Sequence, residues 1–126
     1  MRSDAFKRAA EAKDFSQVSE LFTEDVTFKS PVVFKAYEGR EALGVVLGAV
    51  VKVFEDFRYI EQVENGDTAV LMFEARAGDR DLQGVDILRF GENDQIRELI
   101  VMVRPMSGMH ALADEMKKML EAAEAV

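Results

Sequence analysis

The second half of the chain alternates between apolar and polar residues with a period of two. Alternation of this kind is typical of β-strands, because successive side chains of a strand point to opposite faces of its sheet. It predicts four strands, at residues 57–64, 68–77, 82–90 and 96–104. The connections, residues 65–67, 78–80 and 91–94, are short and rich in Gly, Asn and Asp, which favour tight hairpins. The sequence therefore predicts an antiparallel meander of four strands.

Helical spacing of apolar residues predicts helices on both sides of this meander, over residues 4–13, 15–22, 40–54 and 107–123. We expect Asp4 to cap the first helix and Asp14 or Ser16 to cap the second. Residues 23–25 are expected to end the second helix, and a short strand follows at residues 26–29. The chain is thus expected to be a single α+β domain over residues 1–126.

Two glycines lie within the third predicted helix, at Gly44 and Gly48. Each glycine costs a helix about 1 kcal/mol relative to alanine. We therefore expect another element to pack closely against this helix at these two positions.

Charge and composition narrow the range of partners. The chain has 16 Lys and Arg against 24 Asp and Glu, a formal net charge of −8, so its field repels nucleic acids and anionic membranes. It has no cysteine, which excludes disulfides and thiolate chemistry. Clusters with metal-ligand spacing and glycine-rich phosphate loops are also lacking, so we expect no metal and no cofactor. Residues 1–7 do not resemble a secretion signal, and we expect a cytoplasmic protein.

The order of helix, helix, short strand, loop, helix and four strands resembles the nuclear transport factor 2-like superfamily, whose members include ketosteroid isomerase and polyketide-cyclase-like proteins. The local matches are residues 12–15 leading to 21–26, then residues 37–42 and residues 84–90. The resemblance implies a cone-shaped, strongly bent, mainly antiparallel sheet, with helices packed across an apolar cavity, and a protein that forms dimers.

The same resemblance can be examined residue by residue. Ketosteroid isomerase uses an aspartate base together with a tyrosine and a protonated aspartate that hold the enolate oxygen. The resemblance places the base at Ser30, the tyrosine at Phe6 and the second aspartate at Asp86. A serine is too weakly basic for this role and a phenylalanine has no hydroxyl to donate, so isomerisation by that mechanism is not expected. Epoxide hydrolases of this fold use a carboxylate where Val101 stands, and the histidine of cyclase-like relatives has no counterpart except His110, on the last helix.

Asp86 is the candidate catalytic residue. Alternation places it on one face of its predicted strand with Leu82, Gly84, Leu88 and Phe90. Burial among these residues should raise its pKa, so that the acid stays protonated and acts as a hydrogen-bond donor or general acid. The opposite face is only slightly more polar, so an Asp86 that points outward or pairs with an arginine is the alternative.

The inward faces of the strands suggest an apolar wall with few polar groups, as in small-molecule sites. Tyr37 and Tyr59 could each supply a phenolic donor. The alternative is that these side chains are ordinary core residues. The candidate ligand-binding residues are Phe6, Ser30, Tyr37, Phe54, Tyr59, Leu71, Phe73, Leu88, Leu99, Val101 and Val103.

The opposite faces of the same strands mix apolar residues with both signs of charge. This pattern suits a homodimer that buries Met72, Ile100 and Met102 and pairs glutamates with arginines across the interface. A solvated outer surface is the alternative.

We therefore expect a pocket protein for a small apolar molecule, with acid–base isomerisation, cyclisation or hydration through Asp86 as the candidate reactions. The alternative is a non-catalytic dimerisation or ligand-carrying module whose cavity is closed by Phe6, Phe54 and Phe73. An open cavity around Asp86 favours the first hypothesis, and a solidly packed interior favours the second.

Overall fold

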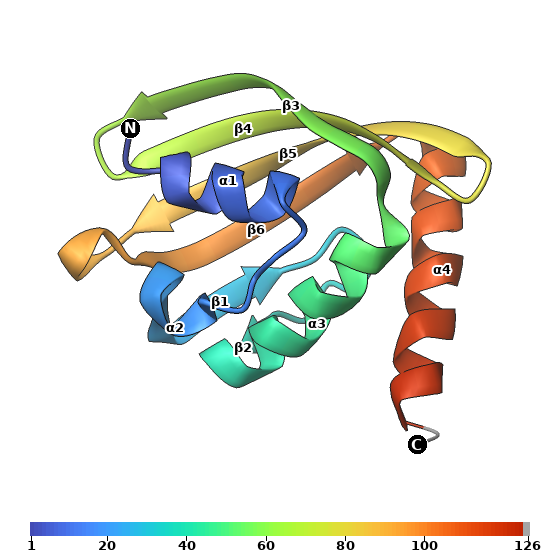
Figure 1. The fold of residues 1–126 in the computed structure, drawn as a ribbon, viewed down its shortest axis with the longest axis horizontal. Coiled ribbons are helices and arrows are strands. Elements are labelled where there is room, and N and C mark those ends of the chain that lie inside the picture. The colour runs from blue at the N-terminus through green and yellow to red at the C-terminus, as the bar shows by residue number, and fades with distance from the viewer. Residues whose placement is uncertain (125–126) are drawn as a thin grey trace.

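The computed structural model describes residues 1–124, in which helices lie across the concave side of one curved six-stranded sheet (Figure 1). In chain order the elements are α1 Asp4–Glu11, α2 Val18–Leu21, β1 Phe22–Lys29, β2 Tyr37–Glu38, α3 Arg40–Val53, β3 Glu55–Asn65, β4 Thr68–Ala77, β5 Arg80–Phe90, a 3-10 turn at Glu92–Asp94, β6 Ile96–Arg104 and α4 Met106–Glu124. The strand order across the sheet is β2-β1-β6-β5-β4-β3.

The predicted four-stranded meander is confirmed. Strands β3, β4, β5 and β6 pair antiparallel in sequence order, and their bounds lie within two residues of the predicted ones. Gly66 and Gly78 take positive φ angles of 62° and 60° in the first two hairpins, a conformation that glycine adopts without strain. Alternation also identified the buried face correctly, because every second residue of β4 and β5 is buried.

The prediction for residues 15–25 is wrong. Helix α2 has four residues only, and Phe22 begins a strand that continues to Lys29. In that strand Phe22 lies opposite Ile96 of β6, and the two strands run parallel. Both side chains are buried, so the pairing between distant parts of the chain outweighs the local helical spacing.

Two further local predictions are also wrong. Gly48 has no atom within 4 Å of the position where a Cβ would lie, and Gly44 has only one, at 3.9 Å, so neither glycine is needed for close packing. Asp4 does not cap α1, since the N-cap residue is Ser3 and Asp4 bonds to the amino terminus instead.

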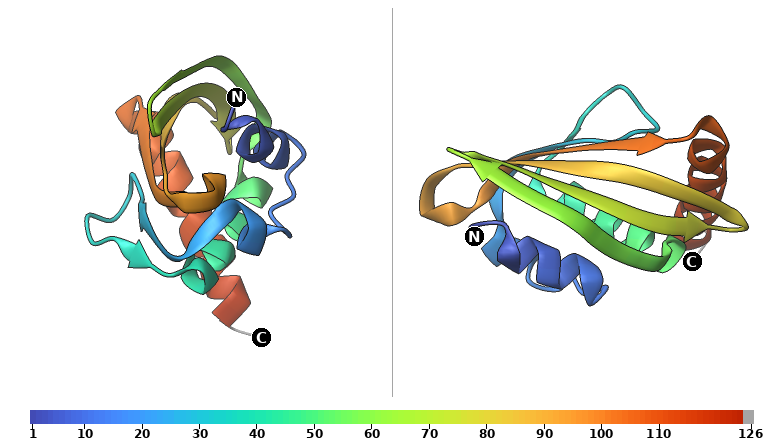
Figure 2. Two further views of the ribbon diagram at one scale, coloured as in Figure 1. Left: turned by 90° about the vertical axis from the view of Figure 1, so that its left-hand side faces the viewer. Right: turned by 90° about the horizontal axis from the view of Figure 1, so that it is seen from above.

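The sheet curls around an interior, and helices lie across its open side. Seen from its end, the sheet wraps from β3 round to β6, with α1 and α3 opposite its concave face (Figure 2). The long helix α4 contacts β4, β5, β6 and α3 (Figure 1). This is the expected α+β fold with a strongly bent, mainly antiparallel sheet.

A bulge in β3 determines which of its side chains face the interior. Tyr59 lies opposite Phe73 of β4 and Glu61 lies opposite the preceding residue, Met72, so Ile60 is an extra residue. An extra residue reverses the facing of those that follow it. Tyr59 therefore points inward before the bulge, and even-numbered residues do so after it.

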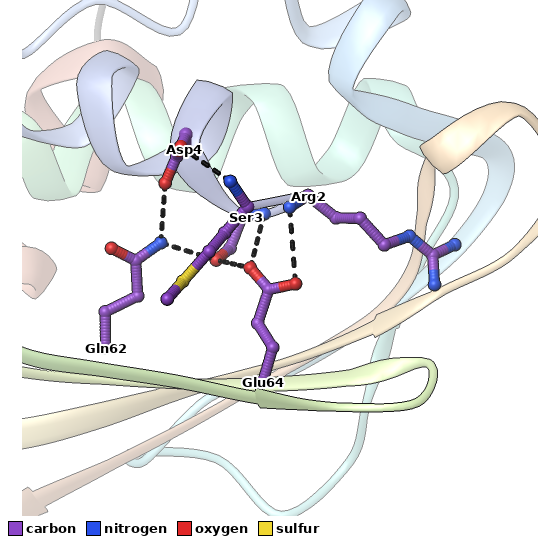
Figure 3. A network of polar contacts seen from close by, with 6 residues as sticks. Arg2, Ser3, Asp4, Gln62 and Glu64 are labelled. Carbon is purple, nitrogen blue, oxygen red and sulfur yellow. Dashed lines mark hydrogen bonds and ion pairs between the residues drawn. The ribbon is translucent and has the colours of Figure 1, made fainter.

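Two of those even-numbered residues hold α1 against the sheet (Figure 3). The Glu64 carboxylate accepts hydrogen bonds from the backbone N–H groups of Arg2 and Ser3 and from the Ser3 hydroxyl, at 3.2, 3.0 and 2.5 Å. The Gln62 amide donates to Ser3 Oγ and to Asp4 Oδ1. Glu64 thus satisfies backbone donors at the start of α1 that have no partner within the helix. Burial raises the pKa of Glu64, but the hydrogen bonds from Ser3 and Arg2 outweigh this effect and lower the pKa below its ordinary value.

Helix α1 is also held at its other end. Lys13 follows it with a positive φ of 57°, and its ammonium donates a 2.9 Å hydrogen bond to the carbonyl of Phe54, at the end of α3. Helix α1 is therefore fixed across the concave face of the sheet at both ends.

Candidate functional site

Asp86 lies on the concave face of β5, in a rung with Leu71 of β4 and Val101 of β6. Its exposed fraction is 6%, and within the described side chains it is the only acidic or basic residue that is buried. Asp86 therefore points inward, and the alternative of an outward or arginine-paired carboxylate is wrong.

The partner of Asp86 is the phenol of Tyr59. The Tyr59 hydroxyl donates a 2.5 Å hydrogen bond to Asp86 Oδ2, a length typical of a hydroxyl that donates to a carboxylate. Tyr59 faces inward before the bulge of β3, and its hydroxyl can therefore reach over β4 to Asp86 on β5. No sequence pattern singled out this pair.

The two groups alter each other's proton affinity. Burial raises the pKa of Asp86 to about 7, and the hydrogen bond from Tyr59 opposes this shift by favouring the carboxylate. Burial, and then the charge of Asp86, raise the pKa of Tyr59 well above its ordinary value. Near neutral pH, Asp86 is therefore present both as an acid that can donate a hydrogen bond and as a carboxylate that can accept one.

Asp86 and Tyr59 line an internal cavity of about 330 Å³. This is within the ~300–1,000 Å³ of typical small-molecule sites. Most of the wall is apolar or aromatic, and the side chains come from α1, β1, α3, the sheet and α4. Exposed residues such as Lys13, Val32 and Lys117 line its outer end, so the cavity reaches the protein surface.

Most of the candidate residues lie around this one cavity. Those that line it, besides Asp86, are Phe6, Ser30, Tyr37, Phe54, Tyr59, Phe73, Leu99 and Val101. The other three do not. Leu71 and Leu88 face inward but are completely covered by neighbouring core residues, and Val103 lines a separate surface hollow with Met102 and Met109. Alternation identifies the inward face of a strand, but it cannot tell which residues of that face other side chains cover.

Other residues line the cavity that the sequence patterns did not single out as ligand-binding. They are Phe15, Phe28, Val46, Leu47, Val50, Phe57, Leu112 and Met116 among others. The helical spacing of the residues from α3 and α4 predicted burial, and that spacing is the signal that could have found them. It does not distinguish a side chain that lines a cavity from one that fills the core.

Ser30 does not have a free hydroxyl to offer. The hydroxyl donates to the carbonyl of Val33, at 3.4 Å, and its Oγ accepts hydrogen bonds from the backbone N–H groups of Val32 and Val33, at 3.3 and 3.1 Å. These bonds hold the turn that follows β1. Ser30 therefore supports the loop beside the cavity, and a base is missing at the position where the resemblance placed one.

The single histidine of the chain does not belong to the cavity. His110 is exposed on α4 and is not among the residues that line the cavity. Among the side chains that the structure describes, those of residues 1–121, no three from His, Asp and Glu lie close enough together to hold a metal ion. The helices of this region include none with the length and apolar character needed to span a membrane.

A bent sheet with helices across an apolar cavity is the fold expected for the nuclear transport factor 2-like superfamily, and comparison with known families identifies the family. Residues 4–99 match the SnoaL-like domain, and the chain belongs to this family, within the nuclear transport factor 2-like superfamily. The comparison with curated proteins gave no match.

Solved structures include close relatives. A steroid delta-isomerase from Pseudomonas aeruginosa is 37% identical, with a TM-score of 0.95 over 99% of this chain and 93% of that one. An uncharacterised protein with a cystatin-like fold from Silicibacter pomeroyi is 33% identical, with a TM-score of 0.86 over 90% and 80% of the two chains. A protein of unknown function from Mesorhizobium loti is 19% identical, with a TM-score of 0.73 over 82% and 88%, and shares the fold alone.

The raised pKa of Asp86 predicts how the stability of the protein depends on pH. The folded state holds this proton more tightly than the unfolded chain, so the stabilisation is complete below about pH 4 and is lost as the pH rises through about 7. We expect Asp86→Asn to be more stable than the wild type at about pH 8 by up to about 4 kcal/mol, and nearly equal to it at about pH 4. Urea unfolding at a series of pH values measures this difference.

The matched control is Asp81→Asn, which changes an exposed aspartate of the same strand. Its stability should follow the wild type across the pH range. A constant difference between wild type and Asp86→Asn at all pH values would contradict the raised pKa.

Proposed function

We propose that this protein binds a small, largely apolar molecule that carries one polar oxygen, and that Asp86 and Tyr59 hold that oxygen. The observation that carries the proposal is the placing of this hydrogen-bonded pair in the wall of an otherwise apolar cavity. A neutral Asp86 would donate to a carbonyl oxygen, and an ionised one would accept from a hydroxyl. The apolar wall would supply affinity and the pair would fix orientation.

The open cavity favours ligand binding over the alternative of a packed interaction module. Phe6, Phe54 and Phe73 were the residues expected to close the interior in that alternative, and all three line an open space instead. The relative named as a steroid delta-isomerase supports steroids as first ligands to test.

Catalysis does not follow as directly as binding. Asp86 has the near-neutral pKa that suits a general acid or base. However, Phe6 has no hydroxyl, and Ser30 is engaged with its own loop, so the residue set of ketosteroid isomerase is incomplete. We therefore propose ligand binding or carriage as the function. Conversion of a β,γ-unsaturated steroid ketone to its conjugated isomer, lost in Asp86→Leu, would extend the function to catalysis.

A pair of ligands that differ by one oxygen tests the proposal. We expect a naphthol to bind the wild type more tightly than naphthalene does. Asp86→Leu replaces the carboxyl group, which donates or accepts, with an apolar side chain of similar size. It should weaken naphthol binding about 10- to 100-fold and leave naphthalene binding unchanged or stronger. Displacement of either ligand from the protein can be followed by its fluorescence.

Asp81→Leu is the control, since this exposed aspartate of β5 lies outside the cavity. Equal losses for both ligands in Asp86→Leu would mean that the pair does not recognise oxygen. Failure of the wild type to bind either ligand would count against the pocket itself.

We also propose a homodimer through the convex face of the sheet. Two rungs of apolar residues cross β4, β5 and β6 on that face, Val70–Ile87–Ile100 and Met72–Val85–Met102. Charged groups flank them, as in the apolar centre and polar rim of an interface. Glu74 and Glu98 are already paired with Arg58 and Arg89 of the same chain, at 2.8 and 2.9 Å. The expected pairing of glutamates with arginines across the interface is therefore not part of the proposal.

The dimer proposal predicts the effect of a charge at the centre of this face. Met102 is 55% exposed in the single chain, and Met102→Asp would place an unpaired carboxylate inside the interface. We expect wild type to have the mass of a dimer in light scattering and Met102→Asp that of a monomer. Val45→Asp on α3, where Val45 is 59% exposed, is the control and should stay dimeric. A monomeric wild type or a dimeric Met102→Asp would overturn the proposal.

A further inference from the structure

Gly84 is buried in the middle of β5, two residues before Asp86 and on the same face. Phe73 lies directly opposite it on β4. A Cβ at position 84 would lie 2.7 Å from Cε2 of Phe73, closer still to Cζ, and 2.7 Å from the carbonyl oxygen of Met102. The ring of Phe73 therefore occupies the space that a side chain at position 84 would need.

The ring of Phe73 belongs to an aromatic cluster formed with Phe54, Phe57 and Tyr59. Its centroid lies 5.0 Å from that of Phe57 and 5.5 Å from that of Phe54. Tyr59 meets Phe57 and Phe73 edge to face, at 4.9 and 6.3 Å and at interplanar angles of 87° and 88°. Such contacts are favourable arrangements of aromatic rings, so the two phenylalanines restrict the orientation of the Tyr59 phenol.

We propose that Gly84 and Phe73 are positioning residues, which hold the Tyr59 hydroxyl against Asp86. The absence of a side chain at position 84 lets the Phe73 ring lie over β5, and this ring supports the phenol from the side. Neither residue has a polar side chain, yet together they would determine whether the bond from Tyr59 to Asp86 forms. The significance of this for ligand binding rests on the proposed function, but the arrangement itself can be tested without a ligand.

The proposal connects the shape of the core to the proton affinity of Asp86. The 2.5 Å bond from Tyr59 stabilises the ionised form of this carboxyl. A phenol that lost its support would rotate or withdraw, and the ionised form would lose its only described partner. Hence a change at Phe73 would alter Asp86 although Phe73 itself has no donor or acceptor.

A double-mutant cycle tests this connection, with the pKa of Asp86 measured by ¹³C NMR titration of its carboxyl carbon. In the wild type we expect Tyr59→Phe to raise the pKa of Asp86 by about one, a roughly tenfold gain in proton affinity. In the Phe73→Leu background the bond is already weakened, so adding Tyr59→Phe should cause a much smaller change. The cycle cancels any direct effect of the lost ring, such as the entry of water.

Phe90→Leu is the matched control. Phe90 lies on the same face of β5 and is 4% exposed, but it is not a member of the aromatic cluster. In that background Tyr59→Phe should have its full wild-type effect.

Gly84→Ala is a second variant that disturbs the aromatic cluster, because it keeps the Phe73 ring but displaces it. Circular dichroism verifies that each variant is folded.

The outcomes separate this inference from the proposed function. A reduced effect of Tyr59→Phe in Phe73→Leu or Gly84→Ala, with a full effect in Phe90→Leu, supports positioning. A full effect in every folded background would show that Tyr59 reaches Asp86 without this support and would overturn the inference. That result would leave the pocket untouched, because no ligand takes part in the measurement.

Discussion

The site depends on one constraint, which is that a carboxyl group removed from water must be neutral or must find a hydrogen-bond partner. Asp86 meets it in both ways, because burial raises its pKa and the Tyr59 hydroxyl remains bonded to it. The features that bring Tyr59 there are structural. The bulge at Ile60 turns the phenol inward, and Phe57 and Phe73 support the ring. The polar centre of the cavity is thus a product of how the sheet is bent and packed.

Much of this architecture could be predicted from the sequence, and the reason is physical. The faces of β4 and β5 are governed by burial, and burial imposes a period of two, so alternation placed Asp86 on one face with Leu82, Gly84 and Leu88. The two faces of β5 differ little in polarity, so the family resemblance was also needed to favour the inward direction. The pairing of Phe22 with Ile96 could not be found in this way, because it joins residues far apart in the chain and local spacing favoured a helix. The hydrogen bond between Tyr59 and Asp86 also joins residues far apart in the chain. In addition, it depends on one extra residue in β3, which alternation cannot locate.

The comparisons and the site give complementary information. Close similarity to a steroid delta-isomerase over nearly the whole chain supports the fold. Chemistry, however, belongs to particular side chains, and here Phe6 and Ser30 stand at positions where the resemblance would require a phenol and a carboxylate. Tyr59 supplies a phenol from β3, whereas Phe6 lies on α1, and this phenol is bonded to Asp86. The same scaffold therefore carries a different polar pair in its cavity, and this pair supports the proposed ligand binding more directly than it supports proton abstraction.

Asp86 is a buried carboxyl bonded to Tyr59 inside an apolar cavity. The most direct test is a pH titration of the wild-type protein, in which ¹³C NMR follows the carboxyl carbon of Asp86. We expect a midpoint near 7, far above the ~3.9 of an ordinary aspartate. A midpoint near that ordinary value would mean that the carboxyl is in contact with water and is not buried in the cavity.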